Sequence, residues 1–503
     1  MTTVLTIDLG TGGPKVAFVN TEGVVLWWEH TPIATTLGEG GLATQDAGHW
    51  WEVIRAGISR GLRVVPAADV RAVAVTGQWA STVPVDAQGR PTGPCVMWLD
   101  ERGGPFTRKA IGGPLMGYHP GRLATWVRRT GAIPTTTGAD PVGHMLLLEN
   151  DPPPATRWYL EPVDYLAMCF TRVPAATHAS MTAAWLTDNR DLSAMAYDDD
   201  LVAHTGINPE RLPPLVPIGS VIGPVHPEVA TELGLRPDTV VITGLPDLHA
   251  ATVGSGGVGL GEGHASIGTT GWVSAPVKEK KTDLLHQMAT VPGLDNNTYL
   301  IGNNQESAGR ALGWFRDAVA PDVSFEDLLD EAGGAPVGAE GVVFTPWIAG
   351  ERSPVENKVA RGGFHNLSAE TTRAHLTRAV IEGVAFNTRW LLTPTEKFVG
   401  HQMEPLRLVG GGARSDLWCQ VMADVTGRTV VSSRNPLLAG VSGMALMAGI
   451  ALGELAMGEV RDLVSTPRRF EPRAAASERY SEIYAEFPKL FAMQKGFFAR
   501  MNR

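Results

Sequence analysis

The stretch TIDLGTGGPK, from Thr6 to Lys15, places three glycines, two threonines, an aspartate and a lysine directly beside apolar residues. VLTI at its start and KVAFVN at its end are typical of strands, and VVLWWE, beyond the turn TEG, predicts a third strand. A Walker A loop or a dinucleotide fingerprint requires a helix after the glycine-rich loop, and neither consensus spacing occurs here. The chain is therefore predicted to open with a β-meander, and both common nucleotide motifs are excluded for this loop.

Length and composition predict a soluble protein of two domains. The chain has 503 residues, of which 44% are hydrophobic and 19% charged. Its net charge of -10 gives no bulk electrostatic reason to bind nucleic acid or an anionic membrane. The three cysteines are far apart, and the first residues do not resemble a secretory signal. The longest apolar run, Leu437 to Gly453, is short for a membrane span and predicts a buried helix, so a cytoplasmic protein is expected.

The second half of the chain repeats the opening pattern. GHASIGTTGWVSAPV predicts a strand, a turn at Gly268–Gly271 and a returning strand, and LRLVGGGARSDLWCQVMADVTGRTVV predicts strand, glycine turn, helix and strand. A new strand begins near Val240, where we place the domain boundary. From about Ala474 the tail has the pattern of a long amphipathic helix, interrupted near Pro488.

Nine segments in this order resemble the FGGY family of carbohydrate kinases, most closely its xylulokinases. Besides the opening hairpin they are TQDAGHWW, GQWAST, WLDER, GLPDLHAATVGSG, SIGTTGW, TPWIAGERSP, GGFHNLSAETTRAHLTRAVIEGVAF and VGGGARSDLWCQVMADVTG. Each is weak alone, and only the ordered set is specific. The resemblance implies an α/β protein with the two-domain actin-like ATPase (ribonuclease H-like) fold. It implies a sugar-binding domain at 1–241, a nucleotide-binding domain at 242–465, and a helical tail at 466–503 that is expected to pack back on the first domain.

The two glycine-rich hairpins are expected to hold ATP phosphates between them. Backbone N–H groups of a glycine-rich turn can approach phosphates closely, and phosphoryl transfer depends mainly on such positioning and on charge neutralisation. Lys15 would supply a cation, and Asp8 would hold Mg²⁺ through water. The alternatives are a plain hairpin and, for the triple glycine, a tight turn between strand and helix. The expected nucleotide contacts are Gly10, Thr11, Gly12, Lys15, Gly268, Thr269, Thr270, Gly309, Gly411, Gly412 and Ser415.

Asp247, in GLPDLHAA, corresponds in this resemblance to the catalytic aspartate. A carboxylate within hydrogen-bond reach can accept the proton of a sugar hydroxyl as it attacks the γ-phosphorus. Asp247 is also expected to contact the sugar and the metal. The alternative is a cap on the helix that follows, and both roles can hold at once. His249 is expected to serve packing or to support a neighbouring site residue rather than to bind a ligand.

Four residues are expected to contact the sugar: Gln78, Trp79, Asp100 and Arg102. The alternatives are a core role for Trp79 and a surface ion pair for Asp100 with Arg102. Glu351–Arg352 is expected to be structural. The chain departs from the family pattern at Gly12, Pro14, Trp79–Ala80, His144 and Asn366, and His144 is assigned no chemistry.

The reaction implied is transfer of the γ-phosphoryl of ATP to a pentulose, D-xylulose first, with Mg²⁺. The alternatives are a kinase for another ketose or a small polyol such as ribulose, erythritol or xylitol, and a non-catalytic actin-like nucleotide sensor. A homodimer is possible, and neither nucleic acid nor a membrane is an expected partner.

Overall fold

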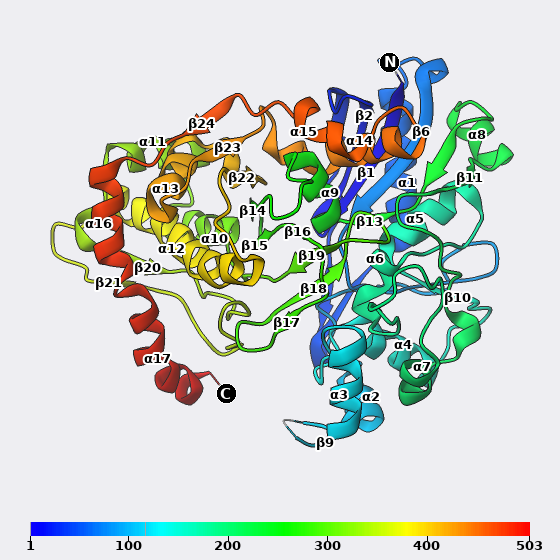
Figure 1. Cartoon of the computed structure of the whole chain (residues 1–503), viewed down its shortest axis with the longest axis horizontal. Coiled ribbons are helices and arrows are strands. Elements are labelled where there is room, and N and C mark those ends of the chain that lie inside the picture. The colour runs from blue at the N-terminus through cyan, green and yellow to red at the C-terminus, as the bar shows by residue number, and fades with distance from the viewer. Residues whose placement is uncertain (1, 116, 503) are drawn as a thin grey trace.

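A mixed sheet forms the centre of the N-terminal half in the computed structural model, which describes residues 2–115 and 117–502 (Figure 1). Its strands lie in the order β11 (Val221–Pro224), β12 (Val240–Ile242), β6 (Val70–Gly77), β1 (Thr3–Gly10), β2 (Gly13–Asn20) and β3 (Val25–His30), and β13 (Leu245–Pro246) also pairs with β6. β1, β2 and β3 form the predicted antiparallel meander, while β6 runs parallel to β1.

One face of this sheet is covered by α1 (Ala47–Gly61), α5 (Pro162–Thr171) and α8 (Pro227–Leu233). α1 begins after Asp46, because the carboxylate of Asp46 accepts hydrogen bonds from the N–H groups of Gly48 and His49. Trp50, Ile54 and Ile58 of this helix are fully buried against the strands. This is the amphipathic pattern that defines α1 in the sequence.

The opposite face is covered by α9 (Asp247–Ser255) and α14 (Ala439–Ala451). α14 is the buried helix predicted from the apolar run, and Figure 1 shows it in orange beside β1 and β2. The two helices approach closely through glycines: a Cβ at Gly443 would lie 2.0 Å from the carbonyl oxygen of Ala250, and one at Gly254 would lie 1.8 Å from that of Ala439. A helix from late in the chain therefore covers one face of the sheet that the first strands of the chain form.

A smaller, largely helical region extends from the N-terminal sheet. It contains β4 (Thr36–Gly38), β5 (Leu42–Gln45), β7 (Val83–Val85), β8 (Cys95–Val96), α2 (Gly104–Ile111), β9 (Gly112–Leu115), α3 (Pro120–Arg129), α4 (Pro141–Asn150), β10 (Trp158–Leu160), α6 (His178–Met181) and α7 (Asp199–Thr205). A separate apolar cluster around Trp126 holds its helices together.

The C-terminal half contains a second sheet, with strands in the order β15 (Gly271–Ser274), β14 (His264–Ile267), β22 (Leu406–Val409), β23 (Val430–Ser432) and β24 (Arg468–Phe470). Like β1, β14 pairs antiparallel with the strand after it and parallel with a distant one. The predicted two-domain actin-like ATPase fold, with ribonuclease H-like sheets, is thus confirmed. The other elements of this half are β16 (Pro276–Val277), β17 (Thr282–Asp283), β18 (Met288–Pro292), β19 (Tyr299–Gly302), α10 (Gly309–Val319), α11 (Phe325–Gly334), β20 (Val343–Thr345), β21 (Gly363–His365), α12 (Arg373–Val399), α13 (Asp416–Thr426) and α15 (Val460–Leu463).

The tail forms α16 (Ala474–Tyr484) and α17 (Phe487–Met501), with a break just before Pro488 as predicted. It packs on the C-terminal half, and the expectation that it returns to the N-terminal domain is wrong. Phe487 contacts the rings of Trp347 and Phe386, and the hydroxyl of Tyr480 donates to Glu382 at 2.6 Å. Amphipathicity predicts that one face of a helix is buried, but it carries no information on which surface receives that face.

The stretch around Glu351 is structural, as expected, although not as a pair with Arg352. The buried Glu351 carboxylate accepts the side-chain N–H of Asn387 and the backbone N–H groups of Glu306 and Arg352. Burial raises the pKa of Glu351 to about 8. Arg352 instead pairs with the carboxylate of Glu306 at 3.1 Å.

Asn366, which departs from the family's glycine, has φ of 62°, a left-handed conformation that asparagine tolerates better than most residues. Within the part of the chain that the structure describes, no helix combines the length and the apolarity that crossing a membrane requires.

Candidate functional site

Three parallel strands end side by side in the N-terminal half and bring their next residues together. In β1 and β6, Asp8 lies opposite Thr76, and in β13 and β6, Pro246 lies opposite Gly77. Gln78 and Asp247 directly follow these strands. Side chains at the carboxyl ends of neighbouring parallel strands are a common place for ligand contacts in α/β proteins.

Two carboxylates and one amine form the charged centre of this site. The Nζ atom of Lys15 lies 2.7 Å from Oδ2 of Asp8, and the Asp8 charge raises the pKa of Lys15. Burial raises the pKa of Asp247 to about 7, and the Asp8 carboxylate adds to this rise while Lys15 opposes it. Asp8, Lys15 and Asp247, which the sequence assigns to one centre, therefore act on one another in the fold.

Asp247 stands at the first position of α9 and is only partly buried. Its Oδ1 accepts the N–H of Leu248 at 2.8 Å, which leaves Oδ2 without a hydrogen bond to the described residues. The helix-start role and the base role are thus compatible, as the sequence allows. His249 is buried and its Nε2 donates a hydrogen bond to the carbonyl oxygen of Pro292 at 2.8 Å, which is a structural contact.

The first hairpin is held tightly at its base and open at its tip. Gly13 has φ of 126°, and a Cβ there would lie 2.1 Å from the carbonyl oxygen of Thr31, so only glycine fits. Gly12 is exposed, with nothing within 4 Å of a Cβ position. Gly10 pairs with Gly13 across the turn. The exposed tip is thus available to a phosphate, and a serine or threonine at position 12 would fit.

The second hairpin is braced from two directions. The N–H of Gly309, at the start of α10, donates to the carbonyl oxygen of Gly268 at 2.7 Å. The N–H of Ala308 donates to the carbonyl oxygen of Thr269 at 3.1 Å. The Thr269 residue is exposed and Thr270 is partly buried. Gly309 therefore supports the hairpin through close backbone contact.

The triple glycine lies against the same hairpin. A Cβ at Gly410 would be 2.7 Å from the carbonyl oxygen of Ile267, and one at Gly412 would be 2.3 Å from Cγ2 of that side chain. Gly411 is exposed, with open space at its Cβ position. Ser415 caps α13 by accepting the N–H of Trp418. Of the three glycines, Gly411 offers the backbone surface most accessible to an adenosine.

Trp79 and Asp100, two of the expected sugar contacts, both bind other groups of the protein. The indole N–H of Trp79 donates to the carbonyl oxygen of Ser180 at 2.8 Å, and its ring meets that of His249 edge-on. Asp100 is fully buried, and its oxygens accept from the N–H of Ala43 and from the guanidinium of Arg102. Asp100 thus orients Arg102. In this ion pair the carboxylate of Asp100 is buried, while the guanidinium of Arg102 is partly exposed.

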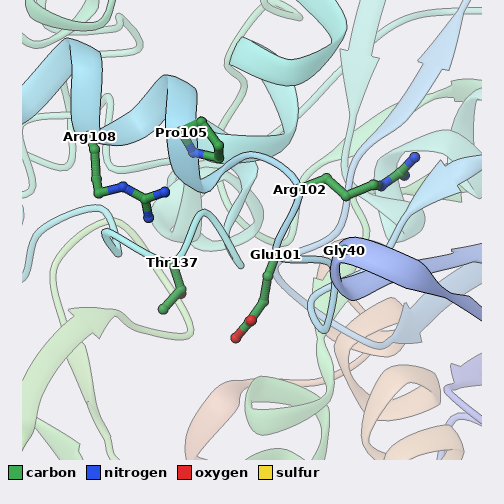
Figure 2. A pocket seen from close by; sticks show the side chains of 6 residues that line it. All are labelled: Gly40, Glu101, Arg102, Pro105, Arg108 and Thr137. Carbon is green, nitrogen blue, oxygen red and sulfur yellow. The ribbon is translucent and has the colours of Figure 1, made fainter. Parts of the chain in front are cut away.

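A pocket of about 450 Å³ lies beside this ion pair (Figure 2). It is lined by Gly40, Glu101, Arg102, Pro105, Arg108 and Thr137. Figure 2 shows the Arg102 side chain extending away from Arg108 and Thr137. His144, from α4, is buried nearby with its Nδ1 3.4 Å from the Thr82 hydroxyl, and burial lowers its pKa to about 4, which favours the neutral side chain near pH 7.

The side chains of Trp98 and Gln45 both contact Thr11 at the site, and the sequence predicts neither contact. The indole N–H of Trp98 donates to the Thr11 hydroxyl at 3.2 Å, and the side-chain amide of Gln45 donates to the Thr11 carbonyl oxygen at 2.8 Å. Gln45 ends β5 immediately before the capping residue Asp46. A polar residue at a strand end is the only signal that the sequence offers for it.

Mg²⁺ suits the donor set of this centre. Among residues 2–115 and 117–502 no three His, Cys, Asp or Glu side chains form a metal site of their own. Asp8 and Asp247 face each other closely enough for one charge to raise the pKa of the other, and carboxylates together with phosphate oxygens are the ligands that Mg²⁺ prefers.

Comparison with known proteins identifies the family. The models of the N-terminal and C-terminal domains of the FGGY family of carbohydrate kinases match residues 3–254 and 263–452. A xylulose kinase from Staphylococcus epidermidis is 27% identical over 98% of this chain and 97% of its own length, and a gluconokinase from Bacillus licheniformis is 24% identical over 97% and 95%. The solved xylulose kinase from Rhodospirillum rubrum has a TM-score of 0.83 and 27% identity, covering 99% of this chain and all of that one. The chain therefore belongs to the FGGY family of carbohydrate kinases and is a phosphotransferase.

Proposed function

We propose that this protein transfers the γ-phosphoryl group of ATP to a hydroxyl of a pentulose, D-xylulose first, and that Asp247 is the general base. The observation that carries the proposal is the partly exposed Asp247, with its raised pKa, beside Asp8 and Lys15 at the ends of three parallel strands. The xylulose kinases among the similar proteins support the choice of D-xylulose.

In the proposed reaction, Asp247 accepts the proton of the acceptor hydroxyl as its oxygen bonds to the γ-phosphorus. The bond between that phosphorus and the bridging oxygen breaks, and ADP leaves with the electron pair. Lys15 and the backbone of the hairpin at Gly10–Gly13 stabilise the phosphate charge. Asp8 and Asp247 would hold Mg²⁺, which supplies further charge neutralisation when bound.

The substrate is tested by ADP release from MgATP against a panel of pentuloses, hexuloses, polyols and gluconate, with a blank that contains no acceptor. We expect the largest kcat/KM with D-xylulose. A second candidate, gluconate, is included because the gluconokinase from Bacillus licheniformis matches nearly the whole chain. A polyol or gluconate as the preferred acceptor would contradict the choice of D-xylulose, and slow ATP hydrolysis unaffected by every acceptor would favour the nucleotide-sensor alternative.

The pH dependence provides a test of the base. At saturating acceptor, kcat/KM for MgATP is expected to fall about tenfold per pH unit below pH 7, because a protonated Asp247 cannot accept the hydroxyl proton. The midpoint follows from the pKa of about 7 that burial and Asp8 give to Asp247 before the nucleotide binds. In Asp8→Asn the repelling charge is absent and Lys15 loses its first partner, so the midpoint should move to lower pH. A midpoint that is the same in both proteins would show that another group titrates.

A further inference from the structure

We propose that Gln45 is a positioning residue that fixes the side-chain amide of Gln78, so that Oε1 of Gln78 accepts a hydrogen bond from a second hydroxyl of the acceptor. The same Gln45 side chain holds the first hairpin. The inference deepens the proposed function and rests on it, since it assigns a recognition role within the acceptor site of the kinase.

The orientation of the Gln45 amide is determined by partners that cannot change roles. The indole Nε1 of Trp50 can only donate, and it lies 3.1 Å from Oε1 of Gln45. The carbonyl oxygen of Thr11 can only accept, and it lies 2.8 Å from Nε2 of Gln45. Nε2 also donates to the Thr35 hydroxyl at 3.0 Å. Since Gln45 and Trp50 are both buried, the amide of Gln45 has one orientation only.

This orientation determines that of Gln78. Nε2 of Gln78 lies 3.4 Å from Oε1 of Gln45 and donates to it. The reversed amide would place two carbonyl oxygens against each other. Oε1 of Gln78 is therefore the free end, and it has no hydrogen-bond partner among the described residues although the residue is only 5% exposed. A buried acceptor without a donor is costly, so the site is built for a group that brings an O–H or N–H to it.

The free oxygen lies within the acceptor site. Gln78 directly follows Gly77, which is opposite Pro246, and Asp247 directly follows Pro246. Trp79, the residue after Gln78, and His249, two residues after Asp247, have their ring centroids 5.9 Å apart, so the two segments stay together. A substrate hydroxyl on Asp247 thus has Gln78 as its neighbour, which selects acceptors that carry a second hydroxyl near the reacting one. A keto group, a methyl group or hydrogen in that place would leave Oε1 unpaired.

Gln45 also connects this recognition to the phosphate hairpin. Its bond to the Thr11 carbonyl oxygen joins the turn at Gly10–Gly13 to the residue that orients Gln78. Gln45→Leu removes both links. Gln45→Glu keeps an acceptor for Trp50 and Gln78 but brings no donor to Thr11. The two variants therefore separate the two roles.

The test compares the preferred acceptor with its singly deoxygenated analogues. In the wild type, loss of one particular hydroxyl other than the reacting one should lower kcat/KM about tenfold or more, as expected when a buried polar group is left unpaired. In Gln78→Leu and Gln45→Leu, the ratio of kcat/KM for the preferred acceptor to kcat/KM for this deoxy analogue should fall to within about twofold of one. Gln45→Glu should keep the wild-type ratio and instead raise KM for MgATP about tenfold. Gln88→Leu is the control and should behave as wild type. Gln88 is exposed, and its side chain accepts a hydrogen bond from Arg90 and not from Gln45 or Gln78.

A second readout does not depend on turnover. With ¹⁵N-labelled tryptophan, the Trp50 indole signal, assigned from Trp50→Phe, should move upfield in Gln45→Leu and stay in place in Gln45→Glu. An unmoved signal in Gln45→Leu would overturn the proposal that Gln45 orients Gln78. The proposal would also be overturned if Gln78→Leu discriminated against the deoxy analogue as strongly as the wild type does. If no acceptor in the panel is phosphorylated, the proposed function fails, and the indole signal still decides whether Gln45 has the assigned orientation.

Discussion

Asp247→Asn is expected to lower kcat by at least about 100-fold while MgATP still binds, because positioned general bases contribute roughly 10²–10⁴-fold to proton transfer. The amide has nearly the shape of the carboxylate and can still accept the N–H of Leu248, which the Asp247 carboxylate accepts at 2.8 Å. It cannot take up the hydroxyl proton. Steady-state kinetics with the preferred acceptor and a separate measurement of MgATP binding would separate chemistry from binding.

Two controls sharpen this experiment. Asp46→Asn alters another carboxylate at a helix start, where the amide remains a good cap for α1, so its kcat should stay within about twofold of wild type. Asp247→Glu should retain part of the activity because it keeps a base at a displaced position. A kcat for Asp247→Asn within about threefold of wild type would remove Asp247 from the role of base.

Gly443→Ala is expected to destabilise the protein by about 3 kcal/mol, the upper range for overpacking a tight core. The added Cβ would lie 2.0 Å from the carbonyl oxygen of Ala250 and 2.7 Å from the N–H nitrogen of Gly254. Both are backbone atoms of α9, so they cannot rotate away as a side chain would, and α9 and α14 must separate. The midpoint of thermal unfolding should fall by roughly 3–6 °C, because the unfolding entropy by which the free-energy change is divided is large for a chain of this length.

Gly313→Ala is the matched control. Gly313 lies inside α10, and nothing lies within 4 Å of its Cβ position. Alanine should stabilise this helix by about 0.5–1 kcal/mol, because it lowers the entropy of the unfolded chain and has the higher helix propensity. If Gly443→Ala and Gly313→Ala shift the midpoint in the same direction, the close contact between α9 and α14 does not limit stability.

The parts of the site that were predicted depend on neighbours in the sequence. The hairpin at Gly10–Gly13 and the cap at Asp46 are determined by residues within a few positions, and the hairpin forms as predicted. Asp247 could be assigned because the resemblance carries it. The sequence allows an ion pair of Asp100 with Arg102, but it does not show that Asp100 is buried and bound to the distant N–H of Ala43.

Gln45 shows why the rest could not be predicted. Its partners Thr11, Trp50 and Gln78 come from a hairpin, a helix and a strand end, and no periodicity links them. The prediction of where the tail packs is wrong for a related reason. Its apolar face predicts burial, but the aromatic surface around Trp347 that receives it is assembled from other segments.

The position of α14 on the first sheet has a consequence for how the protein folds during its synthesis. β1, β2 and β6 leave the ribosome early, but the helix that covers one of their faces is among the last parts of the chain to emerge. Until then Val4, Ala17 and Ala74 have no cover from α14, which favours chaperone binding and slow completion of the fold. A chain divided between residues 254 and 263, where the two family domains meet, would leave each piece with an uncovered apolar face. The two domains are separate in the family description, but the first sheet depends for the cover of one face on a helix that comes late in the chain.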